Sequence, residues 1–129
     1  MPLNTEDWNF ILESLERNHI DENFITEIIE PKFSSRSLVS NFDNLGENFM
    51  FYSIVYQNKP LLNYLFQNVQ YSSIPEKCQK KIKDSVYRGI KQLSYDCESF
   101  FAFLQELFHI IIQSSFKTIL IGNHCCFIY

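Results

Sequence analysis

Several cysteine and histidine side chains in this sequence could ligate a metal ion. They are Cys78, Cys97, His109, His124, Cys125 and Cys126. Zinc sites need thiolates and imidazoles that converge on one tetrahedral ion, and their cysteines are usually separated by a short spacer. The last two cysteines are adjacent, so both thiolates cannot easily turn inward together, and no Cys-x-x-Cys pair occurs. We therefore predict no metal site.

The same residue types could perform nucleophilic catalysis, which needs a Cys or Ser beside a His that an acid orients. No such residue stands in a recognisable nucleophile elbow. The three glycines of the chain are too few and too scattered for a phosphate-binding loop. We expect Cys78 and Cys97 to be small buried hydrophobic residues. The chain is predicted not to be an enzyme, with no catalytic residue and no cofactor.

A basic helix face could bind an acidic protein. Residues 77–91 carry six basic residues and one acidic residue, whereas residues 1–30 carry eight acidic residues and one basic residue. The two segments could face each other, or the basic face could meet a partner, or it could simply be solvated. The candidate binding residues on this face are Lys80, Lys81 and Arg88.

The composition indicates one compact, ordered domain. The chain has 129 residues, of which 46% are hydrophobic, and contains thirteen Phe and seven Tyr. Its net charge of −4 argues against general nucleic-acid binding, because such binding depends on neutralising phosphates. The acidic N-terminal segment does not resemble a signal peptide, and the cysteine pattern is a poor disulfide framework. We therefore expect a cytoplasmic or nuclear protein.

Helix signals divide the chain into three helix pairs, 5–30, 48–69 and 74–113, followed by a C-terminal tail, 114–129. In the first pair, Asn4 or Thr5 is predicted to cap one helix and Asp21 the next. Pro31 is predicted to end that second helix. Residues 32–47 are predicted to form a loop.

The central pair, Phe49 to Asn68, is the clearest of the three. It has a corner at residues 57–59, and Pro60 is predicted at the first helical position, where its missing N–H has no cost. Behind the proline, four apolar residues share one helix face and need a neighbouring element to cover them. These residues are Leu61, Leu62, Leu65 and Phe66.

The third pair is predicted to begin with a capping box at residues 73–76, and Asp96 is predicted to cap a helix from Cys97 to about Gln113. That helix is apolar nearly all round, so we expect it to be the most enclosed helix in the domain. Its polar interruptions make it too short to span a membrane. Residues 115–129 could form a strand or another helix.

The three pairs repeat one pattern with a period near that of stacked helical repeats. Its small residues are Ser14, Ser53 and Gly89, and its apolar doublets are Phe24-Ile25, Leu61-Leu62 and Phe100-Phe101. Residues 50–54 and 61–68 of the central pair resemble the two helices of an ankyrin repeat. In this comparison Gln57 stands where the family has a glycine and Lys59 where it has a buried leucine.

The ankyrin resemblance implies an all-α solenoid of stacked helix pairs, a non-enzymatic scaffold that binds a protein through the exposed side of its first helices. Carried over to this chain, the binding positions are Tyr52, Val55 and Tyr56. The alternative is a compact helical bundle that serves as a regulatory or structural subunit, and these tyrosines could then pack inside. The apolar residues 123–129 are expected to fold back as a lid. The alternatives are that they meet a partner or a second copy of the chain, or that the chain is a piece of a longer array.

Overall fold

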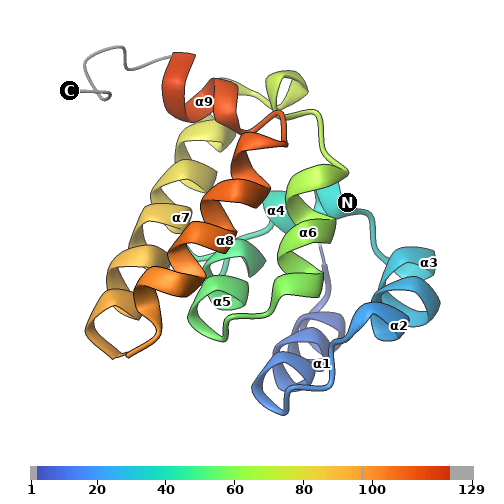
Figure 1. Cartoon of the computed structure of the whole chain (residues 1–129). Coiled ribbons are helices and arrows are strands. Elements are labelled where there is room, and N and C mark those ends of the chain that lie inside the picture. The colour runs from blue at the N-terminus through green and yellow to red at the C-terminus, as the bar shows by residue number, and fades with distance from the viewer. Residues whose placement is uncertain (1–2, 97, 123–129) are drawn as a thin grey trace.

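The structure, a computed structural model, describes residues 3–96 and 98–122, and every regular element in this part of the chain is helical (Figure 1). The predicted all-α class is therefore confirmed. The end of the described chain, for which the sequence left strand and helix open, is helical. The elements are α1 (Thr5–Glu16), α2 (Glu22–Phe24), the π-helix η1 (Ile25–Ile29), α3 (Glu30–Lys32), α4 (Ser35–Ser40), α5 (Phe49–Val55), α6 (Lys59–Gln67), the 3₁₀-helix η2 (Tyr71–Ser73), α7 (Glu76–Asp96), α8 (Phe100–Ile112) and α9 (Lys117–Gly122).

Short polar side chains start the helices of the first two pairs. The side-chain oxygen of Asn4 accepts a hydrogen bond from an amide in the first turn of α1, and Asp21 does the same for α2. Asn58 caps α6 in this way, so Lys59 is the first residue of that helix and Pro60 the second. Each cap satisfies an amide that has no partner within the helix, and these helix starts are therefore encoded locally.

The first two helix pairs turn through the same backbone corner. Asn18 and Gln57 both adopt the left-handed conformation, with φ of 57° and 53°. In each corner the next amide donates to a carbonyl five residues earlier, at Ser14 over 2.9 Å and at Ser53 over 2.8 Å. This is the Schellman ending of a helix, in which glycine usually occupies the left-handed position. The two corners lie 39 residues apart, which is the spacing of their buried serines.

Pro31 does not end its helix, contrary to the sequence prediction. The chain widens into the π-helix η1 before the proline, and α3 then continues through Pro31 to Lys32. A π turn bonds five residues back and leaves room for the proline ring, which would clash with a carbonyl of a regular helix. Residues 32–47 are also not entirely loop, because α4 forms within them and Ser34 caps it.

The capping signals of the third pair were misread. α7 begins at Glu76, and the Ser73 hydroxyl donates to the Gln70 carbonyl within the 3₁₀ turn that precedes the helix. Asp96 is the last residue of α7 and does not cap the next helix, which starts at Phe100. The buried stripe of α7 reaches Leu93, and the helical turn that begins there runs on to Asp96, so Asp96 lies inside α7.

The helices pack as two neighbouring series. α1 contacts α5, and α5 packs most extensively against α7; η1 contacts α6, and α6 contacts α8. In Figure 1, α8 lies between α7 on its left and α6 on its right, and α5 lies lower in the view. The centre of the core belongs to α5 and α6, whose inward residues are completely buried. These residues are Phe49, Met50, Ile54, Leu61, Leu62, Leu65 and Phe66.

The helices α5 and α7 approach each other closely at Gly89. A β-carbon at this position would lie 3.3 Å from the Phe51 carbonyl oxygen and 3.3 Å from Ile54 Cβ. We expect Gly89→Leu to push the two helices apart and to lower the free energy of unfolding by about 1–3 kcal/mol. Urea denaturation measures this change. Gln92→Leu, at an exposed position of the same helix, is the control, and equal losses from both variants would contradict close packing at Gly89.

Candidate protein-binding surfaces

Tyr52, one of the predicted binding residues on the first helices, packs within the fold. Its ring meets Phe51 edge-on at 5.1 Å between centroids and Trp8 edge-on at 6.4 Å. Its hydroxyl donates a hydrogen bond to the Asp43 carboxylate. Because both its ring and its hydroxyl have partners inside the chain, folding alone accounts for Tyr52.

The other two predicted positions on α5 are more accessible. Val55 is half-buried, and Tyr56 is 42% exposed at the end of the helix. Partial burial, followed by the neighbouring Glu16 carboxylate, raises the pKa of Tyr56 above its ordinary value. Tyr56 is therefore the member of this predicted surface that a partner could reach most easily.

The predicted basic residues of α7 have different environments. Arg88 forms an ion pair with Glu47, with Nε 2.9 Å from the carboxylate, and a second nitrogen donates to the Gly46 carbonyl over 3.1 Å. Lys81 lies over the Phe42 ring, 5.3 Å from its centroid, whereas Lys80 is exposed. Arg88 and Lys81 therefore serve the fold, and Arg88 pairs with Glu47 and not with the acidic N-terminal segment.

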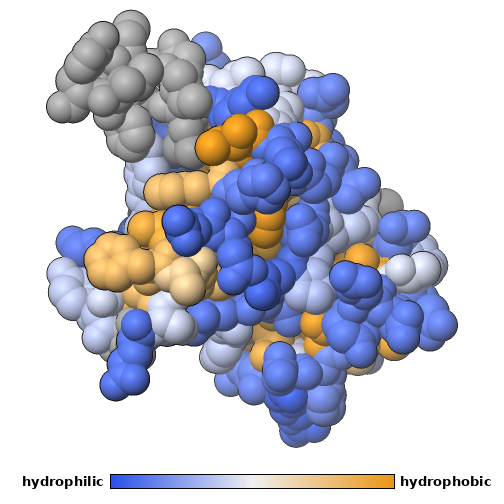
Figure 2. Space-filling model, viewed as in Figure 1, coloured by the Kyte–Doolittle hydropathy of each residue, from blue (hydrophilic) through white to orange (hydrophobic). Residues whose placement is uncertain are grey.

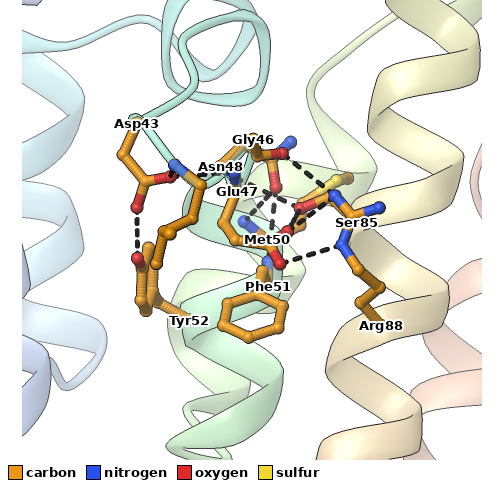
Figure 3. A network of polar contacts seen from close by, with 10 residues as sticks. Asp43, Gly46, Glu47, Asn48, Met50, Phe51, Tyr52, Ser85 and Arg88 are labelled. Carbon is orange, nitrogen blue, oxygen red and sulfur yellow. Dashed lines mark hydrogen bonds and ion pairs between the residues drawn. The ribbon is translucent and has the colours of Figure 1, made fainter.

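Glu47 is the centre of a buried polar network, shown in Figure 3. Its side chain is 9% exposed, and its carboxylate accepts hydrogen bonds from Arg88 and from the Ser85 hydroxyl. The Ser85 oxygen in turn accepts the Asn48 amide over 3.2 Å. A buried carboxylate is stable only when it is paired and hydrogen-bonded, so these contacts fix the loop before α5 onto α7.

The same loop is held on its other side by Asp43. One carboxylate oxygen accepts the amides of Leu45 and Glu47 over 2.9 and 3.0 Å, and the other accepts the Tyr52 hydroxyl (Figure 3). Burial, followed by the hydrogen bond to Asp43, raises the pKa of Tyr52. The folded protein therefore favours the neutral phenol.

The raised pKa of Tyr52 predicts how stability depends on pH. A group whose folded-state pKa is raised stabilises the fold below its unfolded pKa, near 10 for tyrosine, and loses this contribution as the pH rises further. We expect Tyr52→Phe to lower the free energy of unfolding by about 1 kcal/mol at neutral pH. Its stability should also fall less steeply than that of the wild type between about pH 9 and about pH 11.

Urea titrations across that pH range measure both effects. Other tyrosines with raised pKa, such as the buried Tyr71, should retain part of the alkaline loss in the variant. Parallel pH profiles for the two proteins would contradict the role given to the Tyr52–Asp43 contact.

A surface that the sequence did not predict lies on α8. This helix was expected to be the most enclosed, and that expectation is wrong. Phe101 is 77% exposed, Phe108 is 46% exposed and Ile112 is 58% exposed. Figure 2 shows the result as a column of orange and pale orange atoms over α8. We call Phe101, Leu104, Phe108 and Ile112 the α8 stripe.

The α8 stripe arises because this helix has two apolar faces and neighbours on only one of them. Phe103, Leu107, Ile110 and Ile111 are buried against the domain, where α8 contacts α6 and α7. The stripe residues recur every three or four positions and so form a line along the whole helix, on a face next to the buried one. An open depression of about 530 Å³ on this face is lined by uncharged residues. They are Phe101, Ala102, Leu104, Gln105 and Phe108.

Sequence reasoning missed this surface although a signal for it was present. A helix that packs on one side needs an apolar face of only three or four residues in every two turns. The excess of apolar residues in α8 was interpreted as complete burial, when a second contact surface explains it equally well. Only the arrangement of the neighbouring helices distinguishes the two explanations.

Two of the candidate metal ligands, Cys78 and His109, lie in the described part of the chain. Within residues 3–96 and 98–122, no three His, Cys, Asp or Glu side chains come together as a metal site. Cys97, His124, Cys125 and Cys126 lie outside the described residues, as does the expected lid at 123–129. None of the described helices is both long and apolar enough to cross a membrane. The chain matches no protein-family model, no curated protein and no solved structure.

Proposed function

We propose that this chain is a non-enzymatic protein-binding module and that the α8 stripe is its principal docking surface. The observation that carries the proposal is the exposure of three large apolar side chains in one line along one helix. The largest apolar patch on the surface of a soluble domain is often a binding site. Apolar and aromatic side chains of this size are also the usual anchors of protein interfaces.

The proposed architecture is a short stack of degenerate, ankyrin-like helix pairs. Three features support it: the succession α1, α5 and α7, the parallel succession η1, α6 and α8, and the shared corner of the first two pairs. The small residues of the sequence repeat, Ser14, Ser53 and Gly89, are all buried. In such a stack each pair covers the next, and a terminal pair keeps one uncovered side, as α8 does.

The residues whose pKa values are raised have structural roles that account for the shifts. Among the described residues, the raised pKa values belong to tyrosines packed in or against the fold and to Arg88, whose pKa is raised mainly by its hydrogen bond to Glu47. Each group has a partner or a packing environment that explains its shift without a substrate. This supports binding over catalysis as the function.

The α8 stripe can be tested by capture of binding partners. We expect an immobilised wild-type chain to capture one or more proteins from the cells that produce it, and Phe101→Glu with Phe108→Glu to abolish this capture. A carboxylate in the centre of an apolar interface has no partner and opposes binding. Leu45→Glu is the matched control, because Leu45 is 80% exposed on the loop before α5 and should tolerate the charge.

A second variant, Tyr56→Ala, tests the first-helix surface and is expected to reduce capture less than the α8 changes. Circular dichroism and urea denaturation establish that each variant is folded. Capture that survives both glutamates would exclude the α8 stripe, and capture that depends on Tyr56 alone would move the site to α5.

A further inference from the structure

We infer that the protein docked on the α8 stripe is a second copy of this chain, and that two α8 helices pair antiparallel about a two-fold axis. The inference rests on the proposed function and names the partner of the proposed surface. Three properties of the stripe support the inference. The stripe can match a second copy of itself under two-fold symmetry, the depression on it is lined by uncharged residues, and its exposed area fits a weak dimer.

Self-complementarity follows from the order of residues along the stripe. A two-fold axis near the middle of α8 sets Phe101 of one copy opposite Ile112 of the other, and Leu104 opposite Phe108. Each aromatic ring of one copy then meets an aliphatic side chain of the other copy. A two-fold interface requires one surface to match itself in this way. Antiparallel helices also place opposite ends of their dipoles together.

The depression is lined by uncharged side chains, and the one carboxylate of α8, Glu106, is compensated within the chain. Glu106 forms an ion pair with Lys59 of α6, with 2.6 Å between the oxygen and the nitrogen. On the same flank Gln113 Nε2 lies 3.1 Å from His109 Nε2. A partner recognised by charge would need an uncompensated charge beside the depression. An uncharged stripe is best covered by another uncharged surface. The α8 stripe of a second chain is such a surface.

The exposed area fits a weak, reversible dimer. A Phe or residue of similar size presents about 150–250 Å². The exposed fractions of Phe101, Phe108 and Ile112 therefore correspond to roughly 350 Å² per chain, or roughly 700 Å² for two. This area is below the roughly 1,000 Å² of a stable interface and lies in the range of a weak, transient one. The Phe101 ring is also supported by Phe100, with 5.3 Å between centroids.

Sedimentation velocity of the full chain across a range of micromolar concentrations tests the inference. We expect the wild type to shift with concentration toward twice the mass of one chain. Phe101→Glu and Phe108→Glu should each raise the dissociation constant by at least about tenfold, whereas Leu45→Glu should sediment as the wild type does. Phe101 is so exposed that its replacement leaves the folded chain intact, and urea denaturation verifies this.

A mixing experiment tests the antiparallel register. Leu104→Lys and Phe108→Glu should each impair dimerisation alone, and an equal mixture should restore it. In the mixed dimer the introduced lysine of one copy meets the introduced glutamate of the other as an ion pair. Recovery in the mixture supports the proposed register. A mixture that stays as monomeric as its components overturns it.

The remaining outcomes separate the inference from the proposed function. A dimer that is unchanged by both glutamates places the interface elsewhere and overturns the inference. A wild type that is monomeric throughout, yet captures another protein through α8, also overturns it and leaves the protein-binding function intact. A monomer that captures nothing through α8 overturns both.

Discussion

The helices α6 and α8 each have more apolar surface than one neighbouring helix can cover, and this constraint governs the packing around them. The central helix α6 satisfies it completely, because η1 lies on one side of it and α8 on the other, and Leu61, Leu62, Leu65 and Phe66 are fully buried. α8 has the same need but has neighbours on one side. The surface proposed for binding is thus a consequence of the packing rule that forms the core.

A second, polar constraint fixes the part of the chain that does not follow the helix pattern. The loop between α4 and α5 contains Asp43 and Glu47, whose carboxylates accept hydrogen bonds from Tyr52, Ser85 and Arg88. Apolar packing is tolerant of small shifts, whereas a buried carboxylate must meet its donors at defined positions. The network therefore sets how α5 and α7 lie beside each other where Gly89 allows their close contact.

The local features of the fold could be predicted from the sequence because they depend on nearby residues. Asn4 and Asp21 form their predicted caps, and the corner at Gln57 lies where it was expected. Pro31 was misread because the π turn before it relieves the clash that normally ends a helix. The roles of Tyr52 and Arg88 could not be predicted, because their partners belong to a loop that only the folded chain brings to them.

The α8 stripe shows the same limit at the level of the candidate site. Its residues and their spacing are visible in the sequence. Whether such an apolar face is buried or exposed depends on whether another helix packs against it, and the spacing does not reveal this. No local pattern around Phe101 contains that information. The neighbours of α8 decide which of its two apolar faces belongs to the core.

Hydroxyl-radical labelling of the full chain at increasing concentration, quantified by mass spectrometry, measures directly whether the α8 stripe becomes covered. Leu45 serves as the internal reference, since it is as exposed as Phe101 and lies on a different element. The account predicts that labelling of Phe101 and Phe108 decreases as the concentration rises while labelling of Leu45 stays constant. Equal labelling of Phe101 at all concentrations would contradict it.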